Sequence, residues 1–249
     1  MFKTGIEFLD NQVGSLNPGF IILHEVVGAG GREFASTSVI NNVDSGYQVH
    51  YIAITKSRDE VIHDLQLMFP DLNLETRIPR IRIHSFATYY FKESVVPAHW
   101  FDEKAIIETL KSGKGLIEVI VDEFEKLNEC LVFLDSITDL ARASKRLGRE
   151  NVIDLLKGLR TLCIKRKILL LGLLTSGVLE KSLEGEILDL VDGVLVFELV
   201  TEKDSITRWM YFRKFLGVLP KLESERILKY NIRLDPSQGF TISRVMRIL

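Results

Sequence analysis

Short apolar segments alternate with segments of helical periodicity along most of this chain, and that alternation restricts the fold more than any other feature. Two of the apolar segments, residues 131–134 and 168–174, have no polar face, which is typical of strands that helices cover on both sides. Such a pattern predicts an α/β fold with a mostly parallel sheet and crossover helices. The predicted strands are residues 20–26, 48–54, 81–84, 131–134, 168–174 and 194–200.

The pattern changes after Asp192. Residues 205–215, 226–234 and 239–244 are predicted to form consecutive strands, and the DPSQG segment at 235–239 has the residue types of an antiparallel turn. No linker or internal repeat interrupts the chain, so residues 1–249 are predicted to form a single domain. The predicted helices are residues 33–43, 58–68, 103–128 and 151–166.

Composition excludes several classes of protein. The 249 residues include 32 lysines and arginines against 34 aspartates and glutamates, and 46% are hydrophobic, which argues against disorder and against a strongly basic nucleic-acid-binding module. The only cysteines, Cys130 and Cys163, suggest neither a disulfide framework nor a zinc site. No apolar run is long enough for a signal peptide or a membrane helix, so a cytoplasmic protein without membrane contact is expected.

A glycine-rich turn, EVVGAGGRE at residues 25–33, follows the first predicted strand and precedes a helix. A phosphate-binding loop belongs at such a place, because glycines allow backbone N–H groups to point at phosphate oxygens and the helix dipole favours anions. The GxxxxGK[ST] pattern requires glycine, lysine and a hydroxyl residue where this chain has Glu25, Gly31 and Arg32. The motif alone also fits a purely structural strand-to-helix turn.

Seven segments, taken in chain order, strengthen the phosphate-loop interpretation. They are TGIEFLD (4–10), NPG (17–19), GYQVHYIAITKS (46–57), LVFLDSITDL (131–140), LLLGLLTS (169–176), DLVDGVLVFEL (189–199) and RKFLG (213–217). Together they resemble the RecA-like ATPases, in particular the KaiC and RadA-like branch found in archaea and cyanobacteria. The resemblance implies a three-layer RecA-like P-loop NTPase core, an archaeal origin, ATP or ADP with Mg²⁺ as cofactor, and assembly into oligomers with nucleotide at the subunit boundary.

The resemblance assigns roles to several positions outside the turn. Asp135 matches the aspartate that holds Mg²⁺, although an aspartate there also serves as a helix cap, alone or with Ser136 or Asp139. Thr175 matches a sensor of the terminal phosphate, although it also fits ordinary turn chemistry. Lys214 matches a lysine that reaches the neighbouring subunit's nucleotide, while Leu216 replaces the accompanying arginine.

The groups that carry ATPase chemistry in the family are replaced together. Thr55 and Lys56 stand where family members have a catalytic glutamate, and Lys56 is expected either to contact an anion or, as the simpler interpretation, to be solvated. Glu25 and Glu33 bring negative charge that repels a triphosphate, against one cation, Arg32. We therefore predict a pseudo-ATPase with weak or no nucleotide binding, no catalytic residue, and a remnant site of Gly28, Ala29, Gly30, Gly31, Arg32, Glu33, Asp135, Thr175 and Lys214, with Asp135 as the remnant metal position.

Two other functions remain open from the sequence. One is a slow KaiC-like ATPase in which Arg32 and Lys56 replace the missing groups; the other is a RadA-paralogue-like accessory factor in DNA recombination or repair. Residues 141–169 carry nine basic and two acidic residues, whereas residues 101–129 carry eight acidic and four basic residues. Opposite charges favour a homo-oligomer, or a hetero-oligomer with an active paralogue or another protein or peptide; the basic stretch also fits DNA binding or a solvated helix face.

The five histidines show no spacing typical of metal ligands. Ordinary strand and loop positions are therefore predicted for His24, His50, His63, His84 and His99.

Overall fold

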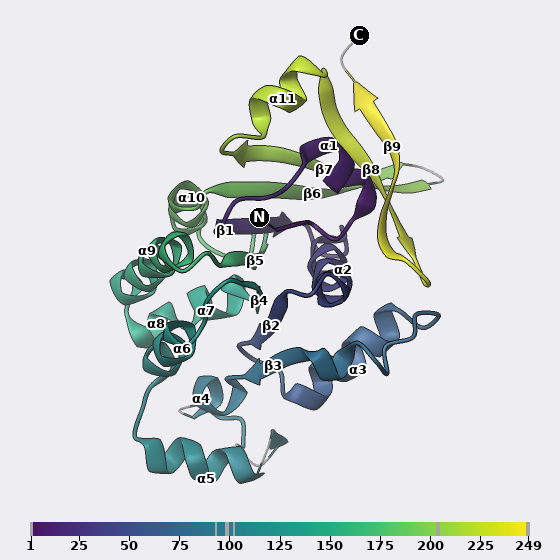
Figure 1. The fold of residues 1–249 in the computed structure, drawn as a ribbon. Coiled ribbons are helices and arrows are strands. Elements are labelled where there is room, and N and C mark those ends of the chain that lie inside the picture. The colour runs from purple at the N-terminus through teal and green to yellow at the C-terminus, as the bar shows by residue number, and fades with distance from the viewer. Residues whose placement is uncertain (1, 93, 98–99, 102, 203–204, 248–249) are drawn as a thin grey trace.

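A single sheet forms the centre of the computed structural model, which describes residues 2–92, 94–97, 100–101, 103–202 and 205–247 (Figure 1). Over this part of the chain the sheet has nine strands in the order β3-β2-β4-β5-β1-β6-β7-β8-β9. Neighbours from β3 to β6 pair in parallel, and those from β6 to β9 pair antiparallel. The strands are β1 Gly19–Glu25, β2 Gln48–Ala53, β3 Ile81–Ser85, β4 Cys130–Asp135, β5 Leu169–Thr175, β6 Gly193–Glu202, β7 Ser205–Phe215, β8 Ile227–Asp235 and β9 Gly239–Arg247.

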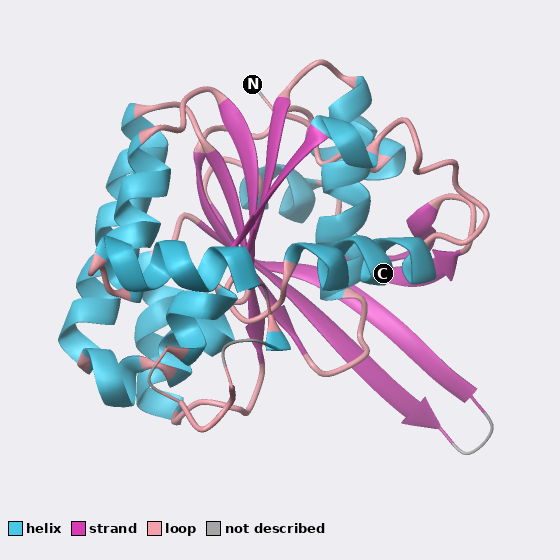
Figure 2. Cartoon of the chain, turned by 90° about the horizontal axis from the view of Figure 1, so that it is seen from below, coloured by secondary structure: helices cyan, strands magenta, loops and turns pink. Residues whose placement is uncertain are grey.

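Helices cover both faces of the sheet, while β6 and β7 extend beyond them as a long hairpin (Figure 2). None of the helices in the described ranges is long and apolar enough to cross a membrane. The helices are α1 Glu7–Val13, α2 Gly31–Asp44, α3 Arg58–Met68, the 3-10 turn η1 Ile78–Arg80, α4 Ala87–Phe91, α5 Glu103–Ser112, α6 Leu116–Glu125, α7 Ile137–Arg142, α8 Ser144–Leu147, α9 Arg149–Lys165, α10 Lys181–Leu190 and α11 Leu219–Ser224.

Two separate hydrophobic cores result from the alternation of side chains along the strands. In β1, Ile21 and Leu23 point to the face covered by α2, whereas Phe20 and Ile22 point to the face covered by α9. Every residue of β1 and β4 is buried, as expected for strands with apolar residues on both faces. The predicted three-layer α/β fold with a mostly parallel sheet is confirmed.

All nine predicted strands are present, with ends that differ by at most three residues. The predicted single helix over residues 103–128 is wrong, because the chain forms α5 and α6 there. Gly113 adopts the left-handed conformation (φ +66°) that ends helices, and the backbone N–H of Gly115 donates to the Glu118 side chain (2.7 Å) to begin the next one. Helices α1, α4, α7, α8, α10 and α11 were not predicted from the sequence.

The C-terminal hairpin of β8 and β9 packs on the first half of α2. The backbone N–H of Phe240 donates to the Thr37 hydroxyl (2.9 Å), and the Phe240 ring lies against Phe34 with centroids 5.2 Å apart. Gly239 precedes this contact with φ +76°, and a Cβ there would lie 2.4 Å from both the Phe69 ring and the Thr37 hydroxyl oxygen. The antiparallel strands β7, β8 and β9 are therefore part of the core that supports α2.

Gly239→Ala is expected to lower the free energy of unfolding by about 2–4 kcal/mol, because the added methyl group meets buried side chains at a backbone conformation that alanine disfavours. Gly158→Ala is the control. Gly158 lies inside α9 with open space around its Cβ position, so alanine there should stabilise by about 0.5–1 kcal/mol. Urea unfolding of both variants measures the difference, and equal effects would contradict the packing of β9 on α2.

Candidate functional site

The glycine-rich turn joins the carboxyl end of β1 to α2. Gly28 and Gly30 have positive φ angles (+79° and +108°), so the turn depends on glycine at both positions. The C-terminal strands fix it from outside: Arg208 Nε donates to the Gly28 carbonyl oxygen (2.8 Å), and a Cβ on Gly30 would lie 3.7 Å from Ile232 and Phe240. The C-terminal strands therefore contact both ends of the turn.

The side chain of Glu25, the last residue of β1, covers the beginning of α2. Its Oε2 accepts hydrogen bonds from the backbone N–H groups of Gly31 (2.8 Å) and Arg32 (3.2 Å). These groups lie at the helix end where a P-loop binds phosphate, because the first N–H groups of a helix have no partner within the helix. A carboxylate of the chain itself thus takes the place of an anionic ligand.

Burial raises the pKa of the Glu25 carboxyl. The hydrogen bonds from the two backbone N–H groups and the charge of Arg32 lower that pKa, while the charge of Glu33 raises it. The net effect is a raised pKa, since Glu25 is only 7% exposed.

Glu25 and Gly31 depend on each other sterically. A Cβ on Gly31 would lie 2.9 Å from Glu25 Oε2, 3.0 Å from Glu25 Cβ and 3.3 Å from the Phe197 ring. Position 31, where a P-loop has its lysine, therefore accommodates only glycine while the Glu25 side chain is in place.

Asp135 ends β4 and is 3% exposed. Its Oδ2 forms an ion pair with the Arg32 guanidinium and accepts a hydrogen bond from the Tyr51 hydroxyl (2.7 Å). The Lys56 ammonium lies 3.5 Å from the same oxygen and 2.6 Å from Asp64. The chain itself therefore neutralises the buried aspartate.

These contacts shift the pKa values of the groups around Asp135. Burial alone would lower the pKa of Arg32, but the charge of Asp135 and the other acidic groups nearby raise it overall, so the guanidinium stays charged. Burial, followed by the charge of Asp135, holds the pKa of the Tyr51 hydroxyl well above its usual value. Tyr51 is thus a neutral hydrogen-bond donor.

Two alternatives from the sequence are settled by this geometry. Asp135 does not cap α7, because the Ser136 hydroxyl accepts the backbone N–H of Asp139 (3.1 Å) and serves as the cap. The prediction of a solvated Lys56 is wrong, since its ammonium pairs with Asp64 and Asp135.

The other predicted site residues lie at two places. Ala29 is fully buried in the turn, Glu33 lies in the first turn of α2, and Thr175 is the register partner of Glu25 in the neighbouring strand. Thr175 uses its backbone N–H to donate to the Thr138 hydroxyl (2.7 Å). Lys214 lies at the opposite end of the sheet, next to the start of β6, where its ammonium donates to the Asp189 carbonyl oxygen.

Tyr51 is the member of this site that the sequence analysis missed. Its side chain points to the same face of β2 as Ala53, whose register partner is Asp135. A strand tyrosine has no local signal that distinguishes it from a core residue. Only the pairing of β2 with β4, which are far apart in sequence, brings the hydroxyl to the aspartate.

Comparison with known proteins places the fold. The structure is similar to that of a KaiC-like protein from the hyperthermophilic archaeon Pyrococcus horikoshii, with a TM-score of 0.68 and 16% identity over 97% of this chain and 98% of that one. It is also similar to the flagellar accessory protein FlaH from Methanocaldococcus jannaschii, with a TM-score of 0.63 and 12% identity over 95% of both chains. No protein-family model and no curated protein sequence matches the chain. The fold is therefore a RecA-like core with antiparallel C-terminal strands.

Arg32→Ala is expected to lower the free energy of unfolding by about 3 kcal/mol, because it leaves the buried Asp135 charge with only Lys56 beside it. Adding Asp135→Asn to this variant should recover most of the loss, since the charge that needed a partner is removed. Arg58→Ala, at an exposed position of α3, is the control, with an expected change within about 0.5 kcal/mol. Additive losses in the double variant would contradict the pairing.

Glu25→Gln tests the raised pKa of Glu25. The native state keeps this proton above the ordinary glutamate pKa of 4.5, so the wild-type free energy of unfolding falls as pH rises from that value through the folded-state pKa. The glutamine variant lacks this fall, and its stability relative to wild type should increase as pH rises above the ordinary glutamate pKa and level off once pH passes the folded-state pKa of Glu25. Exposed Glu7→Gln serves as the control and should show no such trend.

Proposed function

We propose that this protein is a KaiC/RadA-like pseudo-ATPase that acts by binding other protein chains rather than by hydrolysing ATP. The proposal rests on two side chains that occupy the positions where a nucleotide phosphate and a magnesium ion would bind. Glu25 occupies the helix N–H groups that a phosphate needs, and Arg32 occupies the aspartate that a magnesium ion needs. ATP and Mg²⁺ do not fit this arrangement of residues.

The free-energy cost of opening the site also supports weak or absent nucleotide binding. To expose Asp135 to a metal ion, the chain must open its ion pair with Arg32, which costs about 3 kcal/mol and corresponds to roughly a hundredfold loss of affinity. A triphosphate at the start of α2 must also displace the Glu25 carboxylate or face its charge. No lysine or hydroxyl side chain stands at positions 31 and 32 to compensate for these losses.

Protein binding is the activity that remains for such a fold. The turn presents two apolar side chains to solvent, Val26 (42% exposed) and Val27 (74% exposed), at the edge where the nucleotide-binding loop of an active relative lies. A FlaH chain of the same fold is described as an accessory protein. We therefore propose assembly with further copies of this chain or with an active paralogue in the cytoplasm.

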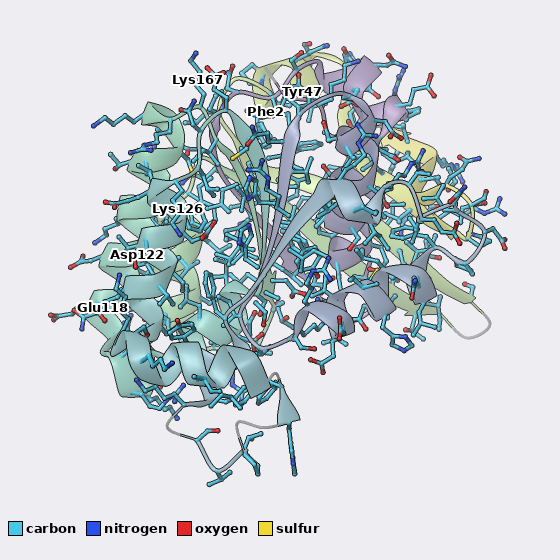
Figure 3. All side chains as sticks on the ribbon, turned by 60° about the horizontal axis from the view of Figure 1, so that its bottom comes forward. Phe2, Tyr47, Glu118, Asp122, Lys126 and Lys167 are labelled. Atoms are coloured by element: carbon cyan, nitrogen blue, oxygen red, sulfur yellow. The ribbon has the colours of Figure 1, made fainter. Side chains whose placement is uncertain are left out.

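The charged stretches do not favour DNA binding over this proposal. Several basic side chains of the 141–169 stretch pair within the chain: Arg149 with Glu186 (3.0 Å), Arg160 with Asp192 (2.6 Å) and Lys167 with Glu129 (2.7 Å). Of the acidic stretch, Asp102 lies outside the described residues. Figure 3 shows Glu118, Asp122 and Lys126 following one another along the outer side of α6, toward Lys167.

Titration with Mg-ATP in a thermal-shift assay tests the proposal. The wild-type melting temperature should not change at millimolar Mg-ATP, because the proposal predicts weak or no binding. A ligand present at 100 times its Kd would stabilise the protein by about 2.7 kcal/mol, which the assay detects as a rise in melting temperature. The combined variant Glu25→Gly, Gly31→Lys and Arg32→Thr restores the GxxxxGK[ST] pattern, and it should gain a Mg²⁺-dependent rise. Glu25→Gly with Arg32→Thr, which lacks the lysine, is the matched control and should gain little.

Three results would overturn the proposal. A saturable, Mg²⁺-dependent rise in wild type, with phosphate release that disappears in Asp135→Asn, would establish a slow ATPase. DNA binding that weakens steeply with salt and is lost in Arg146→Glu or Arg149→Glu would establish the DNA accessory function. A strict monomer at high concentration, with no association with an active paralogue, would contradict action through assembly.

A further inference from the structure

Two histidines meet on the sheet face opposite to Asp135. His50 lies in β2 and His84 in β3, and their rings are nearly parallel (9°) with His50 Nδ1 3.0 Å from His84 Nε2. The other nitrogen of His84, Nδ1, lies 3.4 Å from Glu123 Oε1 on α6. His50 and Tyr51 are consecutive residues of a strand, so their side chains point to opposite faces and the two sites are separate.

The hydrogen bonds within the chain do not satisfy this cluster. The two rings share one hydrogen bond between their facing nitrogens, and Nε2 of His50, a residue only 2% exposed, has no hydrogen-bond partner among the described residues.

We infer that His50, His84 and Glu123 form a binding site for a divalent transition-metal ion of the zinc, cobalt or nickel class. One ligand atom from each residue lies within 4.8 Å of the other two. In a tetrahedral zinc site with Zn–N bonds of about 2.0–2.1 Å, neighbouring ligand atoms are about 3.3 Å apart, so the two nitrogens need to separate by only about 0.3 Å. A metal ion held by these two nitrogens replaces the hydrogen bond between the rings, and the Glu123 carboxylate, which faces the other nitrogen of His84, turns toward the ion.

The nature of the donors selects the kind of metal. Two imidazoles and one carboxylate suit zinc, cobalt and nickel, whereas magnesium and calcium prefer oxygen ligands alone. The Glu123 side chain is 16% exposed and currently pairs with the ammonium of Lys126 (3.1 Å), which is itself 68% exposed and free to move away. His84 is partly exposed as well, so a water molecule can fill the fourth position.

The site joins two layers of the fold. The histidines belong to the two outermost parallel strands, and Glu123 belongs to a helix that covers this face. A metal ion bound to all three therefore ties α6 to the edge of the sheet. This role does not depend on the nucleotide site or on the proposed pseudo-ATPase function.

Cobalt and zinc titration of the full chain, after treatment with a chelator and without nucleotide, tests the inference. One equivalent of Co²⁺ should give the visible absorption of a four-coordinate N/O site, and Zn²⁺ should displace it and raise the melting temperature, whereas Mg²⁺ should do neither. His84→Asn and Glu123→Gln change partly exposed side chains and should each weaken binding by about tenfold or more. His63→Asn, at an exposed position of α3, is the matched control and should leave binding unchanged.

The absence of saturable one-to-one binding would overturn the inference, as would binding that His84→Asn leaves intact. Equal losses in His63→Asn and His84→Asn would also overturn it, since they would indicate nonspecific surface coordination. Circular dichroism of each variant verifies that it is folded. Because nucleotide is absent, these outcomes are independent of the Mg-ATP titration.

Discussion

The burial of the Asp135 carboxylate is the constraint on which the rest of the candidate site depends. A charge at the end of a strand that is covered on both faces costs several kcal/mol unless a cation and hydrogen-bond donors accompany it. Here the partners come from α2, from β2 and from the segment that follows β2. The same contacts that neutralise the aspartate also tie the start of α2 to the middle of the sheet. The charge of Asp135 is therefore balanced by side chains of the chain itself.

Much of the fold was predictable from local sequence, because an uninterrupted apolar run such as LVFL at residues 131–134 is stable only with helices on both faces. The break between α5 and α6 was missed, although Gly113 and Gly115 mark it in the sequence. The sequence predicted which positions form the candidate site, but it did not predict the contacts that their side chains make. Glu25 was expected to repel a phosphate by its charge, and the structure adds that its carboxylate accepts hydrogen bonds from the backbone N–H groups of Gly31 and Arg32. The direction of a side chain at a strand end depends on burial that the sequence does not specify. Tyr51 and His50 acquire their partners only through the register of β2 with its neighbours.

The C-terminal strands have a clear structural role. They supply the Arg208 guanidinium that holds the Gly28 carbonyl, and the Phe240 ring that packs on the aromatic side chains near the start of α2. The glycine turn is therefore contacted by residues that come much later in the chain, such as Arg208, which is 180 positions after Gly28. These contacts join the turn to the C-terminal strands.

The steric contact between Glu25 and position 31 also restricts how this sequence can change over generations. A lysine that appears first at position 31 brings its Cβ 2.9 Å from Glu25 Oε2 and 3.0 Å from Glu25 Cβ, so the glutamate side chain must move aside and release the two helix N–H groups. Loss of the glutamate alone also leaves those groups without this acceptor, while Arg32 still holds Asp135. A return to a lysine-bearing loop thus passes through less stable intermediates in either order. Descendants of this chain are therefore expected to retain glutamate and glycine as a pair or to change both together.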